Sequence, residues 1–173
     1  MGIKRMNHAV LYVRDAQRSA DFYRDVLGFT TVTEFPGGSF LRAPDSTNDH
    51  DIAFFSIGDG AGPSSAGRST VGLYHLAWEV GTLAELAEMG EKLQEVGALV
   101  GASDHVSTKS FYAKDPDGLE FEVCWVVPGE LLPAEVEVGT FPLDLARELR
   151  PLRRPDRGRP LTRPALAGRR GRW

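Results

Sequence analysis

The sequence predicts an α+β fold of two paired βαβββ modules, which together form a cupped, partly closed mixed sheet. A β-rich segment with a histidine near its start occurs around His8 and again around His75. Each of these segments is followed by a helical pattern and then by three shorter strand-like runs. Because one such module is too short to bury a sizeable core alone, we expect the two modules to pack together.

The 173 residues divide into four expected segments. The first module spans residues 1–58 and the second spans 72–127, and a linker rich in Gly, Ser and Pro joins them at 59–71. Residues 128–173 form a C-terminal extension that ends in an Arg- and Pro-rich tail. The tail has too few apolar residues to build a core of its own.

The first module begins with an apolar strand over residues 6–13, and Asp15 is a candidate N-cap for the helix after it. Apolar residues at helical spacing continue until Gly28, which is expected to end the helix. Three strands follow, with a Pro-Gly-Gly turn between the first two. These strands are expected at 29–35, 39–43 and 51–57.

The second module repeats this order. A strand is expected at 73–80, and Thr82 and Glu85 form a capping box for a helix that ends at Gly97. An Asp-Pro-Asp-Gly sequence predicts a turn before the last strand. The remaining strands are expected at 99–102, 109–114 and 119–125, and a short amphipathic run at 141–149.

The net charge of −4 conceals an uneven distribution. Residues 147–173 carry ten Arg against two acids, whereas residues 1–146 carry ten Lys and Arg against 22 acids. An acidic body is unsuited to nucleic acid, so we expect no nucleic-acid partner and interpret the basic tail as a solvated or subunit-clasping arm. The single cysteine, Cys124, excludes an internal disulfide and a Cys-based zinc site.

Membrane and secretory signals are absent from the sequence. No apolar run reaches the roughly 18 residues that a membrane-spanning helix needs. The N-terminal segment also has no apolar stretch typical of a secretory signal. We therefore expect a cytoplasmic protein with no membrane partner.

The histidines and one strand indicate a metal site. If the two modules are related by a pseudo-twofold axis, His8 and His75 approach each other across it. In the last expected strand, two acids and Cys124 share one face while large apolar residues take the other. Two imidazoles and one carboxylate form the facial triad of a non-haem Fe(II) site. A hydrogen-bonded core residue is the commoner role for either histidine alone, but the matched positions favour a shared site.

These residues resemble the vicinal oxygen chelate superfamily, whose members pair βαβββ modules around a divalent metal. The resemblance covers about residues 5–126, which is the body without the tail. It is specific for the superfamily rather than for one of its reactions. The matching sequences are His-Ala-Val-Leu-Tyr-Val at 8–13, Ser-Ala-Asp-Phe-Tyr at 19–23, Val-Leu-Gly-Phe at 26–29 and Asp-Pro-Asp-Gly-Leu-Glu-Phe-Glu at 115–122.

The resemblance implies that His8, His75 and Glu122 bind the metal. In the closing motif of the family the ligating acid stands four residues after the glycine, which selects Glu122 over Glu120. Fe(II) is the expected metal, and Mn(II) is the alternative for the same ligands. Dimers are usual in the family, so we expect a homodimer or a higher homo-oligomer. Whether the modules pair within one chain or between two chains stays open.

Two further segments resemble the type I extradiol dioxygenases of this superfamily. Residues 49–53 are similar to the segment that supplies an active-site histidine, here His50. Residues 104–112 are similar to the segment with a second histidine and a tyrosine, here His105 and Tyr112. The implied reaction is ring cleavage of a catechol-type substrate by dioxygen to a muconic semialdehyde. All three side chains would be catalytic, with His50 exchanging a proton and the other two orienting the substrate oxygen.

Two other functions of the superfamily stay open. A glyoxalase-like lyase or isomerase uses a redox-silent metal and a fourth protein ligand, for which only Asp51 is available in the strand at 51–57. A drug-binding resistance protein keeps the fold and lacks the metal. Three ligands rather than four favour oxygen chemistry, and the presence of all three ligand types argues against a metal-free protein.

Overall fold

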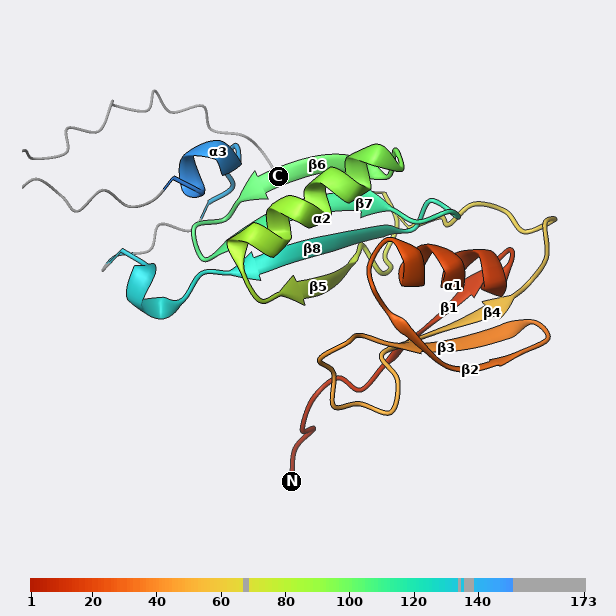
Figure 1. Cartoon of the computed structure of the whole chain (residues 1–173). Helices are drawn as coiled ribbons and strands as arrows, with labels where there is room; N and C mark the ends of the chain where they lie inside the picture. Colours follow the sequence, from red (N-terminus) through yellow and green to blue (C-terminus); the bar gives the residue numbers. More distant parts are fainter. Residues whose placement is uncertain (67–68, 134, 136–138, 151–173) are drawn as a thin grey trace, which may run out of the picture.

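A computed structural model of the chain describes residues 1–66, 69–133, 135 and 139–150. Within them the chain forms two βαβββ modules (Figure 1), so the predicted α+β class and module order are confirmed. The predicted Arg-rich tail lies outside the described residues. No helix in the described part of the chain is long and apolar enough to cross a membrane.

The first module forms a four-stranded sheet in the order β1-β4-β3-β2. Strands β1 and β4 are parallel, and the other neighbours are antiparallel. Asp15 caps the helix as predicted, because its carboxylate accepts hydrogen bonds from the backbone N–H groups of Gln17 and Arg18. The elements are β1 (Ala9–Val13), α1 (Ala16–Asp25), β2 (Thr30–Phe35), β3 (Gly38–Arg42) and β4 (Ile52–Ser56).

The second module has the same topology, with the strand order β5-β8-β7-β6. Thr82 caps the helix as predicted, since its hydroxyl accepts the backbone N–H of Glu85. The Glu85 carboxylate accepts the Thr82 hydroxyl instead of the backbone N–H that a full capping box uses. Two short helices follow the module, η1 (Gly129–Leu131) and α3 (Leu145–Glu148). The module elements are β5 (Leu76–Val80), α2 (Leu83–Glu95), β6 (Leu99–Asp104), β7 (Thr108–Lys114) and β8 (Glu120–Val126).

The two first strands begin later than predicted. β1 begins at Ala9 and β5 at Leu76, so His8 and His75 each lie one residue outside a strand. The ladders start only there, at the pairs Ala9 with Ile52 and Leu76 with Phe121. Apolar residues had extended the predicted strands, but backbone pairing decides where a strand begins. The two histidines therefore occupy equivalent positions, immediately before the first strand of each module.

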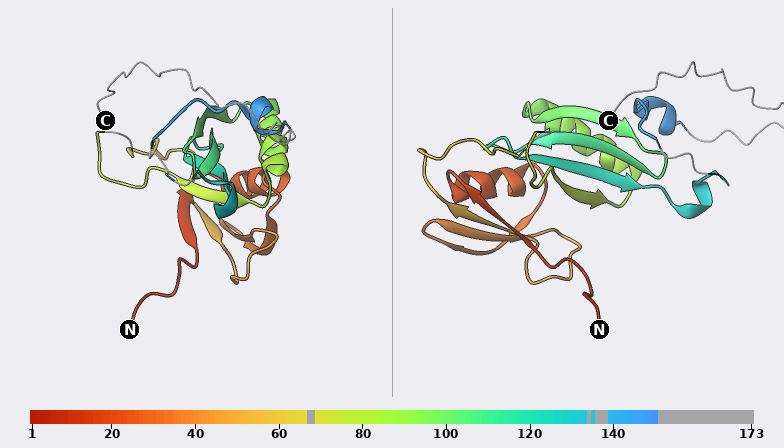
Figure 2. Two further views of the ribbon diagram at one scale, coloured as in Figure 1. Left: turned by 90° about the vertical axis from the view of Figure 1, so that its left-hand side faces the viewer. Right: turned by 180° about the vertical axis from the view of Figure 1, so that it is seen from behind.

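Each sheet has one face covered by its own helix and one open face (Figure 2). On β1, Val13 packs in the core with α1, whereas Val10 and Tyr12 point to the other face and are exposed. On β8, Phe121 and Val123 pack against α2. The alternation of a strand then sends Glu122 and Cys124 to the open face of the second sheet, as the sequence predicted.

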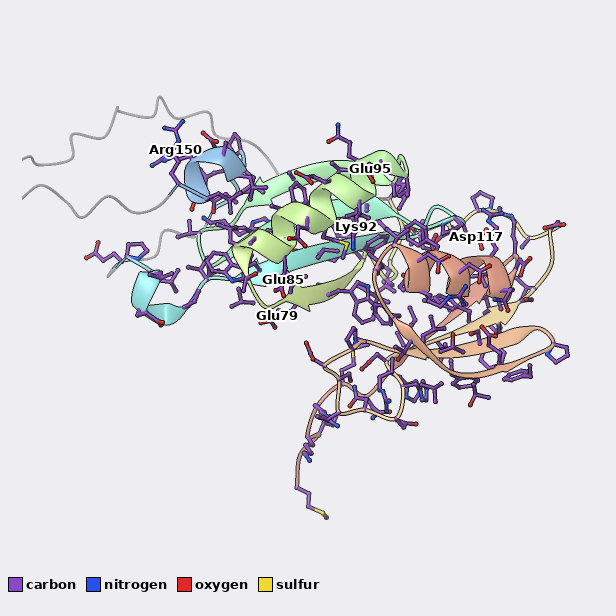
Figure 3. All side chains as sticks on the ribbon, in the orientation of Figure 1. Glu79, Glu85, Lys92, Glu95, Asp117 and Arg150 are labelled. Atoms are coloured by element: carbon purple, nitrogen blue, oxygen red, sulfur yellow. The ribbon has the colours of Figure 1, made fainter. Side chains whose placement is uncertain are left out.

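Helix α1 also joins the two modules. Its Tyr23 ring lies 6.4 Å from the Trp78 ring on β5 and 6.0 Å from the Phe121 ring on β8. Arg14 donates to the two carboxylate oxygens of Asp117, from its guanidinium at 2.7 Å and its backbone N–H at 2.8 Å. Figure 3 shows Asp117 beside α1. The described strands form two separate four-stranded sheets with no ladder between them.

The turn before β8 depends on the buried carboxyl of Asp115. Its Oδ1 accepts the backbone N–H groups of Asp117 and Leu119 at 2.9 and 2.8 Å, while its Oδ2 has no partner among the described residues. Burial raises the pKa of Asp115 from 3.8 to about 6, against the effect of these backbone hydrogen bonds. The folded protein therefore holds this proton more tightly than the unfolded chain does.

We expect Asp115→Asn to remove a pH-dependent part of the stability. Because the pKa is higher in the folded state, Asp115 stabilises the fold below its unfolded value of 3.8, and this contribution is lost as the pH rises through 6. Asn keeps the Oδ1 acceptor and cannot ionise, so about 3 kcal/mol of this pH dependence should disappear. Urea unfolding of both proteins at several pH values between 3.5 and ~8 measures the difference.

Asp117→Asn is a control, because its effect on stability should depend on pH in the opposite direction to that of Asp115→Asn. Partial burial of Asp117 works to raise its pKa, but the hydrogen bonds and charge of Arg14 outweigh this effect and lower the pKa below 3.8. The stability deficit of this variant should therefore be present at neutral pH and vanish in acid. A pH profile of Asp115→Asn that matches the wild type would contradict the role of Asp115.

Candidate functional site

Two of the predicted metal ligands meet on the open face of the second sheet. His75 precedes β5 and Glu122 lies in β8, and Nε2 of the imidazole is 3.0 Å from Oε2 of the carboxylate. The Glu122 side chain is only 12% exposed, and its Oε1 accepts a hydrogen bond from the buried hydroxyl of Ser110 on β7. A buried carboxylate is costly unless it is paired, so these two partners hold it in place.

His105 and Tyr112 lie beside this pair. Tyr112 is the register partner of Glu122, and its ring centroid is 5.7 Å from that of His75. The Tyr112 hydroxyl is 2.9 Å from Nε2 of His105. Burial raises the pKa of Tyr112 to about 12, and the negative charge of Glu122 adds to the shift. Tyr112 is therefore a neutral phenol at neutral pH and can donate a hydrogen bond.

His8 and His50 form a second cluster, on the first module. Their rings are stacked, with centroids 4.3 Å apart and planes inclined by 29°. Nδ1 of His8 is 2.7 Å from the side-chain oxygen of Asn7, and Nδ1 of His50 is 2.8 Å from a carboxylate oxygen of Asp49. The hydrogen bond with His50 is the main reason that the pKa of Asp49 is lowered. The Phe40 ring meets His50 edge-on at 4.9 Å.

The predicted site residues are thus divided between the modules. Among the described residues, no group of three or more His, Cys, Asp or Glu side chains is arranged to hold a metal. In the part of the chain that the structure describes, His8 therefore belongs to one cluster, with His50, and His75 to the other, with Glu122. A cleft of about 1080 Å³ at this junction is lined by Tyr12, Tyr74 and their neighbours, and by none of the predicted ligands.

The pair in the second module fits part of a metal site. One imidazole and one carboxylate supply the nitrogen and oxygen donors that Fe(II), Mn(II) and Zn(II) accept. Nδ1 of His75 is buried and has no hydrogen-bond partner among the described residues, so Nε2, which meets Glu122, is the polar contact of a ring that also packs against Tyr74 and Tyr112. These two side chains supply two of the three ligands of the predicted triad.

The surroundings of Asp51 and Cys124 argue against a metal-binding role for either side chain. Oδ2 of Asp51 accepts the backbone N–H of Ala43 at 2.8 Å, and its Oδ1 accepts hydrogen bonds from Ser46 and Asn48 at 2.7 Å each. The carboxylate therefore organises the loop before β4, which weakens its case as a fourth metal ligand. Burial raises the pKa of Cys124 to about 11, so this side chain is a thiol rather than a thiolate.

Sequence reasoning missed two residues of this cluster. Ser110 lies two positions before Tyr112 on β7, so strand alternation could have placed both beside Glu122. Thr140 lies 3.2 Å from Nδ1 of His105 through its hydroxyl oxygen. No sequence signal marks Thr140, because its contact requires the chain to return to the second module after β8.

The comparisons with known proteins agree with this fold and these motifs. A family model described as the Glyoxalase/Bleomycin resistance protein/Dioxygenase superfamily matches residues 5–123. The biphenyl-2,3-diol 1,2-dioxygenase 3 of Rhodococcus globerulus is 33% identical over 115 residues, which are 66% of this chain and 59% of that protein. The catechol-2,3-dioxygenase of Bacillus subtilis (strain 168) is 30% identical over 121 residues, which are 68% of this chain and 40% of that protein. The chain thus matches 40% and 59% of the length of these two relatives.

Solved structures share the fold. A glyoxylase/bleomycin resistance protein/dioxygenase domain from Frankia sp. EAN1pec has a TM-score of 0.60 at 22% identity, over 74% of this chain and 96% of that one. A lactoylglutathione lyase from Agrobacterium tumefaciens has a TM-score of 0.54 at 21% identity, over 72% of this chain and 96% of that one. At identities of 21% and 22%, these structures show that the fold is shared and do not show a shared function.

The hairpin that carries His105 is strained. Val106 has a φ of +69°, in the left-handed region that β-branched residues avoid. Asp104 holds this conformation, since its Oδ1 accepts the backbone N–H of Val106 at 2.7 Å and the ammonium of Lys109 at 2.5 Å. Backbone strain of this kind clusters at functional sites, where the surrounding structure imposes it.

We expect Val106→Asn to stabilise the protein by about 1 kcal/mol, because Asn enters the left-handed region at a lower cost than Val. Denaturant unfolding measures the change. Val100→Asn is the matched control at an exposed position of β6, where Asn should be neutral or destabilising because it is a poor strand residue. Equal effects of the two substitutions would contradict strain at Val106.

Proposed function

Because the chain belongs to the Glyoxalase/Bleomycin resistance protein/Dioxygenase superfamily, we propose that it is a metal-dependent extradiol dioxygenase. Its substrate is a catechol-type compound, whose aromatic ring it cleaves with dioxygen to a muconic semialdehyde. The observation that carries the proposal is the pair of His75 and Glu122 at 3.0 Å, with the hydrogen-bonded Tyr112 and His105 beside it. The two dioxygenase relatives, at 33% and 30% identity, support the reaction class.

His8, His75 and Glu122 would hold the metal, which is Fe(II), or Mn(II) as the alternative. When bound, it acts as a Lewis acid that lowers the pKa of the substrate hydroxyls and brings substrate and dioxygen together. Ser110 fixes Oε1 of Glu122 and so directs Oε2 towards His75, which presents the two donors to one position.

The remaining polar side chains move protons. Tyr112 and His105 lie 2.9 Å apart and connect the metal-binding side chains with the hairpin between β6 and β7. They orient the substrate oxygen and take up the proton that it loses. His50 would exchange a proton with the reacting group, because its stacking on His8 keeps it close to the third proposed ligand.

Aromatic side chains on the open face of the first sheet offer a wall for the substrate ring. Phe35, Phe40 and Phe55 form a cluster with ring centroids 5.9 to 6.1 Å apart. Phe40 also contacts His50, so this wall is continuous with the histidine cluster. A flat aromatic substrate stacks favourably on such rings.

A second copy of the chain completes the site. His8 lies on the first module, where it stacks on His50, whereas His75 and Glu122 lie on the second. Val10 and Tyr12, on the open face of the first sheet, are 51% and 74% exposed, which is typical of a surface that a partner covers. In a twofold homodimer, the first module of each copy covers the second module of the other and forms two equal sites.

The reaction is tested with catechols and dioxygen. Protein reconstituted anaerobically with Fe(II) should consume oxygen with at least one member of a catechol panel and release a yellow product. The same protein loaded with Zn(II) is the control and should consume none. Metal-loaded protein without oxygen uptake across the panel would overturn the dioxygenase proposal while leaving the metal site intact.

We expect Glu122→Gln to lower Fe(II) affinity by at least about a hundredfold, since the neutral amide replaces the one charged ligand. Metal content after dialysis, measured by elemental analysis, gives the result. Glu120→Gln is the matched control on the same strand, where Glu120 pairs in register with Lys114 instead. Full metal loading of Glu122→Gln would rule out Glu122 as a ligand.

Mixed dimers test the shared site. His8→Ala and Glu122→Gln should each bind no Fe(II) as homodimers. In a dimer with one copy of each, purified through two different affinity tags, His8 of one copy meets His75 and Glu122 of the other. Such a dimer should hold one Fe(II), and its oxygen uptake should be about half that of the wild type. A mixed dimer without metal would mean that the ligands do not come from two chains.

A further inference from the structure

The segment at 139–150 returns to the second module and is fixed there at two points. The backbone N–H of Asp104 donates to the carbonyl of Phe141, and the N–H of Phe141 donates to that of Asp104, both at 2.8 Å. The ammonium of Lys109, a side chain only 8% exposed, lies 2.5 Å from Asp104 and 4.0 Å from Glu148. Figure 1 accordingly shows α3 near the end of β6.

This return brings Thr140 to the imidazole of His105. The Thr140 hydroxyl oxygen is 3.2 Å from Nδ1, and on the other side of the ring Nε2 is 2.9 Å from the Tyr112 hydroxyl. A side chain at Gly139 would meet the Phe141 ring, since an added Cβ would lie 2.8 Å from it. The glycine therefore permits the close turn that presents Thr140.

The partners of a histidine ring decide which nitrogen carries the proton. Thr140 and Tyr112 each carry a hydroxyl, which can donate or accept a hydrogen bond. A tyrosine hydroxyl is protonated at neutral pH, so Tyr112 can donate a hydrogen bond to Nε2 of His105, which lies 2.9 Å from it. If Tyr112 donates to Nε2, the proton of the neutral His105 ring must sit on Nδ1 and point to Thr140.

We infer that Thr140 is a positioning residue that selects the Nδ1–H tautomer of His105. By accepting the Nδ1–H group, it leaves Nε2 free to accept the phenol proton of Tyr112. The Ser103 hydroxyl also hydrogen-bonds to the Tyr112 oxygen, and the remaining lone pair is available to a substrate hydroxyl. When that hydroxyl gives its proton to Tyr112, the phenol proton passes to Nε2. The products are a substrate oxyanion, a neutral tyrosine and an imidazolium that still donates to Thr140.

Thr140 acts through His105 and touches neither the substrate nor the proposed metal ligands. It lies beyond residue 123, where the family match ends, so the family motifs do not assign it. The kinetic part of this inference rests on the proposed function. The tautomer itself does not, which allows the two to be tested separately.

The tautomer is measured by NMR on the metal-free, full-length protein labelled with ¹⁵N, at a pH at which His105 is neutral. Long-range ¹⁵N–¹H spectra should show the proton of wild-type His105 on Nδ1. Thr140→Val removes the acceptor at nearly constant size, and the signals should shift towards the Nε2–H form. Thr140→Ser keeps a hydroxyl and should keep the wild-type pattern.

Thr108→Val is the matched control. Thr108 stands on the same hairpin, and its hydroxyl has no hydrogen bond within the described part of the chain, so its loss should leave the His105 signals unchanged. A proton on Nε2 in the wild type would overturn the inference. A spectrum of Thr140→Val identical to that of the wild type would overturn it as well.

The kinetic consequence is measured on Fe(II)-loaded protein with a catechol that it consumes. Thr140→Val should lower kcat about tenfold and leave KM within about twofold, because one hydrogen bond that organises proton transfer is lost. Thr140→Ser should restore most of kcat. A raised KM with unchanged kcat would contradict a role in proton transfer. Absence of oxygen uptake in every variant and the wild type, with the expected tautomers, would reject the proposed function but not the tautomer assignment.

Discussion

The packing of α1 against the second module is the contact on which the rest of the structure depends. Tyr23 lies between its own sheet and the rings of Trp78 and Phe121, and Arg14 joins the same junction through two hydrogen bonds to Asp117. This junction buries the helix-covered side of the first sheet and leaves the other face of each sheet open. The candidate ligands lie on these open faces or beside them.

The open face of the second sheet is polar because of a second constraint, the buried carboxylate of Glu122. A charge at this depth requires partners, and His75 and Ser110 provide them from β5 and β7. The same strands bring Tyr112 beside it and, through the hairpin, His105. Asp104 and the segment at 139–150 hold that hairpin, so residues outside the paired strands contribute to the geometry of the site.

Local sequence signals predicted those features that depend on neighbours in the chain. The caps at Asp15 and Thr82 and the turn before β8 are present because each requires only a few adjacent residues. The family resemblance predicted that His75 and Glu122 serve one metal site, and the structure brings the two side chains to 3.0 Å of each other. The start of β1 was predicted too early, because apolar residues continue before Ala9 while the ladder to β4 begins only there.

The sequence by itself determined the repeated βαβββ order, the helix caps, the polar face of β8 and the identity of the candidate ligands, since all of these are written in short patterns. Only the tertiary structure decided that His8 stacks on His50 in one module while His75 meets Glu122 in the other, and that Thr140 reaches His105. These contacts join residues distant in the chain. They depend on how whole modules pack, and no local pattern encodes that packing.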